Sequence, residues 1–102
     1  MTAKIVVLYT PPADPGEFDR HYLATHVPLV HAMPGLLRFE SGKFAAAQGE
    51  AEPKYYRAAE LYFADQAALD AARRSEEGKA TAADFQQIAP PGSRVLVEEL
   101  DD

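Results

Sequence analysis

The sequence predicts an α+β fold in which two long helices cover one face of a four-stranded antiparallel sheet. Runs rich in β-branched and aromatic residues occur at 4–10, 36–47, 54–63 and 93–100. Segments with helix-capping residues separate the first strand from the second and the third from the fourth. The resulting order, β-α-β-β-α-β, is that of a split βαβ, or ferredoxin-like, subunit. A chain of 102 residues is expected to form one domain, 1–102.

The first strand ends at two prolines, and signals for a helix follow. Asp14 is positioned to cap this helix, Pro15 suits its first turn, and Glu17 completes a capping box. The helical pattern continues to about Met33, where a Met-Pro-Gly sequence stops it. This segment therefore predicts one helix.

A polar turn region separates the second strand from the third, which is rich in aromatic residues. Asp65 can cap the second helix, and Gly78 is expected to interrupt it. Thr81 is placed to cap a short helical continuation, which an Ala-Pro-Pro-Gly sequence ends before the last strand. The second half of the chain thus repeats the alternation of strand and helix.

The strands carry large apolar residues at both parities, for example Val6 and Leu8 beside Ile5 and Val7. Strands that are apolar on both faces are usually covered on both faces. Because two helices cover only one face, we expect a homodimer in which the other sheet faces of two chains pack together.

Composition excludes several classes of function. The net charge is −6 and the ten Lys and Arg residues are scattered, so we expect no nucleic acid or anionic membrane as partner. There is no cysteine, which excludes disulfides, thiol nucleophiles and iron–sulfur clusters. No segment approaches the roughly 20 apolar residues of a membrane span, and the N-terminus does not resemble a signal peptide. We therefore expect a cytoplasmic protein.

The chain has three histidines, all in the first helix. At 100° per residue, one face of that helix is expected to comprise Phe18, Tyr22, Thr25, His26, Leu29 and Met33. His21 lies at the edge of this face and His31 lies largely opposite, so only His26 is expected to point toward the core. Steps of five residues turn about 140°, so a metal shared by the histidines is geometrically poor and no metal site is expected.

Pro28 lies two residues after His26. It has no N–H and crowds the carbonyl of Ala24, so we expect a bend or loosened turn around residues 24–28. Such a turn frees a backbone acceptor near His26 and can open a gap between the helix and the sheet.

Two interpretations of His26 stay open. It is either a core histidine or a general acid or base in an apolar pocket, a role that suits an unperturbed pKa of about 6.5. In the second case Tyr9, Tyr22 or Tyr62 would orient a substrate oxygen. Glu60, in the middle of an apolar strand, would then set the charge of the imidazole.

Glu60 also has a structural interpretation. A carboxylate in that setting can instead form an interface salt bridge, with Arg38 or Arg57 as the basic partner. The choice depends on which face of the third strand lines the pocket, and the sequence leaves that open.

A specific motif runs through the first helix and the turn after it: Tyr22, His26, Pro28, Leu29, Pro34, Gly35 and Leu36. Together with "YYRAAELYF" at 55–63, it resembles the EthD family of small dimeric α/β-barrel proteins. The resemblance implies a ferredoxin-like subunit and a dimer whose sheets pack into a barrel. It also implies an association with ether or aromatic-compound degradation and a catalytic role for His26, the position that matches the motif histidine.

Three functions are compatible with these observations. The first is a cofactor-free enzyme, of isomerase or monooxygenase type, in which His26 transfers a proton on a small apolar or aromatic metabolite. The second is a non-enzymatic binding or accessory protein of an oxygenase or reductase system. The third is haem binding through His26, which relatives of similar fold suggest.

Overall fold

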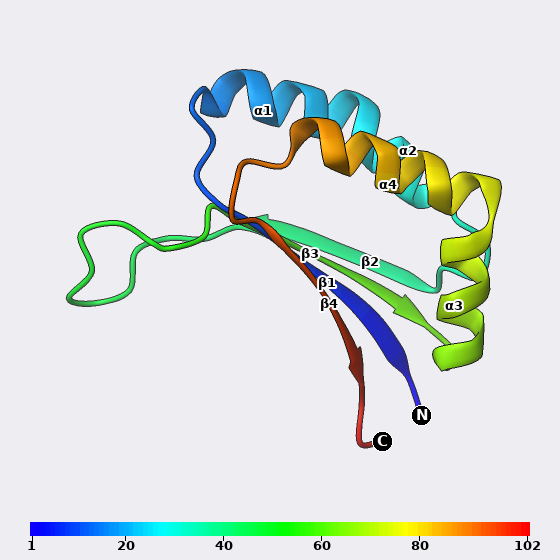
Figure 1. Ribbon diagram of the computed structural model, residues 1–102. Coiled ribbons are helices and arrows are strands. Elements are labelled where there is room, and N and C mark those ends of the chain that lie inside the picture. The colour runs from blue at the N-terminus through cyan, green and yellow to red at the C-terminus, as the bar shows by residue number, and fades with distance from the viewer.

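The computed structural model describes residues 1–102 and confirms the predicted order of elements. Four strands form one antiparallel sheet in the order β2-β3-β1-β4. Their bounds are β1 Ala3–Tyr9, β2 Arg38–Lys43, β3 Arg57–Phe63 and β4 Arg94–Glu99. All the helices lie on one side of this sheet, and the other side carries none (Figure 1).

The register of the sheet assigns each strand residue to a face. Val6 lies opposite Glu60 on β3 and opposite Leu96 on β4, so these three side chains share one face. The alternate residues of β1, among them Val7 and Tyr9, are buried beneath the helices. Strands β1 and β3 thus have one buried face and one half-buried face.

The first helical segment contains three parts: α1 (Pro15–His21), the π-helical turn η1 (Tyr22–His26) and α2 (Val27–His31). The Asp14 carboxylate accepts the Glu17 N–H at 3.1 Å, which confirms the predicted cap. The Val27 N–H bonds the Tyr22 carbonyl, five residues back. The loosened turn expected from Pro28 is therefore confirmed, and it has the form of one π turn.

The π turn changes which residues are buried. The buried positions are Phe18, Tyr22, His26 and Val30, at intervals of four residues. An ideal α-helix predicts Leu29, and this part of the prediction is wrong because Leu29 is only half-buried. A π turn contains more residues per rotation than an α-helical turn. The buried face of the helix therefore continues at Val30, one residue later than steps of 100° predict. Thr25, also predicted on this face, is exposed for the same reason.

The second helical segment consists of α3 (Gln66–Arg74) and α4 (Glu76–Ile88). The interruption predicted at Gly78 lies at Ser75, whose hydroxyl oxygen accepts the Gly78 N–H at 3.0 Å and caps α4. Thr81 is not a cap, since its hydroxyl donates to the Glu77 carbonyl inside the helix. Gly78 is needed for a different reason: a Cβ there would overlap the carbonyl of Ala72 at the end of α3.

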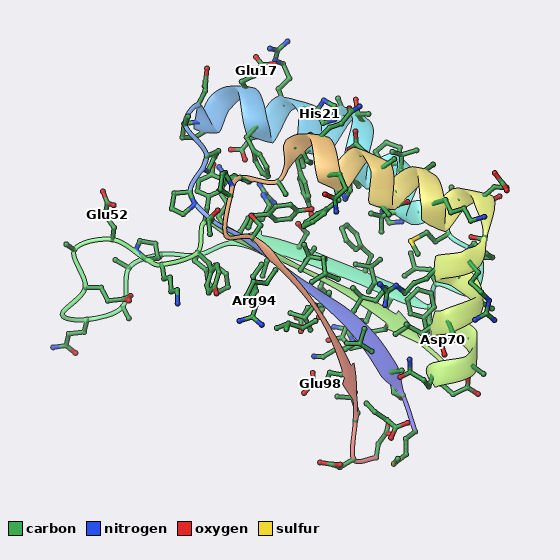
Figure 2. The ribbon with its side chains drawn as sticks, viewed as in Figure 1. Glu17, His21, Glu52, Asp70, Arg94 and Glu98 are labelled. Carbon is green, nitrogen blue, oxygen red and sulfur yellow. The ribbon has the colours of Figure 1, made fainter.

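The core between helices and sheet is built mainly from apolar and aromatic side chains of β1, β3 and the helices. Strand β4 lies at one edge of the sheet, and all its residues are exposed. Leu96 on this strand faces the uncovered side, where Figure 2 also shows Arg94 and Glu98. No helix combines the length and the hydropathy that crossing a membrane requires.

The contact at Gly78 predicts a loss of stability in the Gly78→Ala variant. Helix propensity alone favours alanine by about 1 kcal/mol, but the overlap with the Ala72 backbone is expected to outweigh it and destabilise the fold by about 1–3 kcal/mol. Urea denaturation measures the change. Gly16→Ala in α1 is the matched control, because its added methyl group meets only ordinary contacts. Equal stability of the two variants would contradict the close approach of α3 and α4.

Candidate functional site

A cavity of about 280 Å³ lies between the helices and the covered face of the sheet. Ten of its 15 lining residues are hydrophobic, so its interior favours an apolar molecule. Exposed residues on α3, α4 and β4 form its rim. The lining includes Tyr9, His26, Val30 and Phe85 in the interior and Gln86 and Val95 at the rim.

The polar centre of the cavity is His26, which is 4% exposed. Its Nδ1 lies 2.8 Å from Oδ2 of Asp84, a buried carboxylate on α4. The other oxygen of the same carboxylate, Oδ1, lies 2.8 Å from Nε2 of His21. One carboxylate therefore bridges two imidazoles that are five residues apart in the sequence.

The bridge depends on the π turn. An i→i+5 hydrogen bond brings residues five apart to the same side, as the α-helical bond does for residues four apart. His21 ends α1 and His26 ends η1, so the turn between them aligns the two rings. The prediction that His21 and His26 diverge by about 140° assumed a regular α-helix, and it is wrong for this reason.

The electrostatics of the bridge follow from burial and pairing. Burial alone would raise the pKa of Asp84, but the hydrogen bonds from His21 and His26 outweigh it and hold that pKa below 3.8. An ionised carboxylate only accepts hydrogen bonds, so both imidazoles donate to it. Burial lowers the pKa of His26 below 6.5, although Asp84 opposes this shift. Neutral His26 therefore keeps an unprotonated Nε2.

Tyr9, at the end of β1, lies on the other side of the imidazole. Its hydroxyl oxygen is 3.4 Å from Nε2 of His26, and its ring is fully buried. Burial raises the pKa of Tyr9 far above 10.0, so the hydroxyl keeps its proton and serves as a donor. The structure thus brings Tyr9 and His26 together at the cavity, as the sequence led us to expect.

Tyr22 supports the imidazole rather than lining the cavity. Its ring stacks on that of His26 with centroids 5.6 Å apart, and its hydroxyl lies 2.8 Å from the Ser41 hydroxyl. The guanidinium of buried Arg57 lies 4.4 Å from the centre of the same ring and bonds Asp19 at 3.3 Å. Tyr22 is therefore fixed from both ends, and so is the plane of His26.

The two remaining candidates, Glu60 and Tyr62, lie on the opposite face of the sheet. Glu60 accepts a hydrogen bond from the Lys4 ammonium at 2.7 Å, in place of the expected Arg38 or Arg57. The Tyr62 hydroxyl donates to a carboxylate oxygen of Glu40 at 3.1 Å. Residues 58, 60 and 62 of β3 alternate with the buried ones, so neither side chain reaches His26.

Asp84 takes the place at the imidazole that the sequence had suggested for Glu60. Its signal is an acidic residue one turn before Ile88, on the apolar side of a helix. The signal was weak because the prediction interrupted this helix near Gly78. The short helical continuation that remained around Asp84 did not define an apolar face. No three or more His, Asp or Glu side chains are arranged to hold a metal ion.

The fold corresponds to a known class of protein. A dimeric ferredoxin-like protein of unknown function from Jannaschia superposes with a TM-score of 0.73 at 20% identity, covering 98% of this chain and 100% of that one. SnoaB of Streptomyces nogalater, a cofactor-independent oxygenase, superposes with a TM-score of 0.69 at 16% identity, covering 99% and 94%. At these identities the similarity shows the ferredoxin-like fold alone.

Closer matches define the family. The sequence matches the EthD domain over residues 10–89. An EthD family protein of Bacillus halodurans superposes with a TM-score of 0.92 at 33% identity, covering 98% of this chain and 99% of that one. An uncharacterized 11.0 kDa protein from the thcB-thcC intergenic region of Rhodococcus erythropolis is 40% identical over 93 residues, 91% of this chain and 89% of that one. The chain belongs to the EthD family.

The burial of His26 predicts a dependence of stability on pH. Because its folded pKa lies below its ordinary value of 6.5, the unfolded chain binds more protons just below that pH. The free energy of unfolding is therefore expected to fall as the pH drops below 6.5, until the folded protein also takes up the proton. Urea denaturation between about pH 7.5 and about pH 5 measures this slope. The slope should be smaller in His26→Asn and unchanged in His31→Asn, where the replaced ring is exposed. An equal slope in all three proteins would contradict a buried, neutral His26.

Proposed function

We propose that this protein is a cofactor-free enzyme that moves a proton on a small, largely apolar or aromatic molecule held in the cavity. The observation that carries the proposal is the contact of His26 with both Asp84 and the cavity. A base must be oriented by a second group and must keep one free atom for the substrate. Asp84 orients Nδ1, and Nε2 lies on the side of Tyr9.

The lining of the cavity defines the substrate class. A volume of about 280 Å³ lies at the lower end of ligand sites, which suits a single small ring system or a short chain. The apolar walls exclude a strongly charged body. Tyr9 can donate a hydrogen bond to a carbonyl or phenolate oxygen, while His26 takes or returns the proton on the neighbouring atom.

The proton transfer follows from these positions. Neutral His26 accepts the substrate proton at Nε2, and the imidazolium that forms is stabilised by the Asp84 carboxylate at Nδ1. The negative charge that develops on the substrate oxygen is met by the Tyr9 hydroxyl. The proton then returns to a different substrate atom in an isomerisation. In an oxygenation, the deprotonated carbon instead adds to dioxygen and the peroxide takes up the proton, and the resulting hydroperoxide loses water to leave a carbonyl group. The named activity of SnoaB, a protein of the same fold, is compatible with the second route.

We also propose that the uncovered sheet face is the interface of a homodimer. Leu96 is exposed there beside half-buried Val6, and Lys4 forms ion pairs with Glu60 and Glu98 across three strands. The Jannaschia protein of similar fold is dimeric. A second copy would complete the cover of a face that the helices leave open.

The enzymatic proposal predicts that His26→Ala loses turnover. Removing the base is expected to reduce the rate by about 10²–10⁴-fold. Turnover is measured with small lactones, phenols and quinones as candidate substrates, and product is detected by mass spectrometry. His31→Ala is the matched control and should retain wild-type turnover. If the wild type forms no product and His26→Ala still binds ligand, the protein is instead a binding or accessory protein. A Soret band after haem addition would identify a haem protein.

The dimer proposal predicts that a charge at Leu96 separates the subunits. Sedimentation at micromolar concentration should give a dimer for the wild type and a monomer for Leu96→Glu, because a carboxylate would be buried in the interface without a partner. Leu23→Glu on the helical side is the control and should stay dimeric, since Leu23 is exposed on the opposite side of the molecule. A monomeric wild type would overturn the proposal.

A further inference from the structure

The bridge between His21, Asp84 and His26 has a feature that proton transfer at His26 alone does not require. A single carboxylate would orient His26 equally well without His21. Instead its second oxygen binds another imidazole at the same distance, 2.8 Å. The two rings differ in their surroundings, because the side chain of His21 is 35% exposed and that of His26 is 6% exposed.

We propose that His21 and His26 share the Asp84 carboxylate as one proton-holding unit, in which the solvent-facing His21 sets the protonation state of the buried His26. This inference rests on the proposed function in giving His26 the role of base. His21 is then a positioning residue, which acts on the substrate only through the charge of Asp84.

The sharing follows from the charges at the bridge. Asp84 carries one negative charge and is buried, so it balances one imidazolium. A second imidazolium would face a neutralised carboxylate and a like charge at close range, which disfavours it. The two rings therefore compete for one proton at this carboxylate.

Solvent access decides which ring holds that proton. Desolvation penalises a charge on the enclosed ring of His26, whereas the His21 side chain is partly exposed to solvent. Within the unit, a proton is therefore held better by the more exposed His21 than by His26. With that proton in place His26 stays neutral. Once His21 releases it, the Asp84 carboxylate is free to stabilise the imidazolium that forms when Nε2 accepts a proton from a substrate.

The other titratable groups near His26 add no further negative charge. Tyr9 from β1 and Tyr22 from η1 keep their protons, since burial is the main cause that raises the pKa of each. Arg57 from β3 is a fixed positive charge 4.4 Å from the centre of the Tyr22 ring. Asp84 from α4 is therefore the one negative charge that contacts either ring, and its sharing governs the unit.

The arrangement of the chain supports a shared unit. The π turn is the element that aligns residues five apart, and without it the two rings would not reach the same carboxylate. Figure 2 shows His21 on the helical layer, on the side away from the sheet. The proton thus enters at the surface of the helices, while the base acts on the other side, inside the cavity.

The test measures the protonation of His26 by NMR of the imidazole nitrogens in the full-length protein, with a chelator present so that only protons bind the rings. His21→Gln removes the competing charge and is expected to raise the proton affinity of His26 by about twofold or more. His21→Arg fixes a positive charge beside Asp84 and is expected to lower that affinity by a similar factor. His31→Gln is the matched control and should leave it unchanged.

Opposite changes in the proton affinity of His26 in the two variants support the shared unit. If His21 had only a structural role, both variants would change that affinity in the same direction. The inference would be overturned if the proton affinity of His26 were the same in the wild type, His21→Gln and His21→Arg. A change in the same direction in both variants would also overturn it. Circular dichroism verifies that each variant is folded. The readout needs no substrate, so a lack of turnover in the His26 screen would refute the proposed enzyme without altering this result.

Discussion

The buried carboxylate of Asp84 is the constraint on which the rest of the site depends. An ionised group in that position is stable only when its oxygens are paired, and two imidazoles from the first helical segment pair with them. The contact joins α4 to η1 and fixes the spacing of the two helices above the sheet. It also orients the imidazole of His26 toward the cavity. The packing of the two helices, the orientation of the His26 ring and the charge beside it therefore all depend on this one interaction.

The π turn is the local feature that makes this interaction available. Pro28 removes one backbone donor, and the helix accommodates the loss by a wider turn between Tyr22 and His26. The wider turn brings His21 and His26, five residues apart, to the same carboxylate. A backbone irregularity that costs helical hydrogen bonding is retained at the position where two side chains must meet one partner. This is the setting in which π turns are frequently found.

The sheet separates two groups of polar side chains that the sequence lists close together. Arg57 and Glu60 are three residues apart on β3, yet they lie on opposite faces. Arg57 helps to hold Tyr22 against His26, whereas Glu60 pairs with Lys4 on the side that carries no helix. One face thus carries the candidate site, and the other is the face that we propose for the dimer interface. Strand β3 contributes residues to both faces because successive side chains of a strand point to opposite sides of the sheet.

The sequence by itself determined the order of the elements, the cap at Asp14, the burial of His26 and the loosened turn at Pro28, because each depends on neighbours within a few residues. It also determined the family, through the motif around His26. Only the tertiary structure decided that Asp84, and not Glu60, meets the imidazole. His26 and Asp84 are 58 residues apart, and their contact depends on how two helices pack. The structure places Glu60 and Arg57 on opposite faces of β3, so the expected pairing of these two residues was wrong. Which face is covered is set by where the helices lie, and no local pattern specifies that.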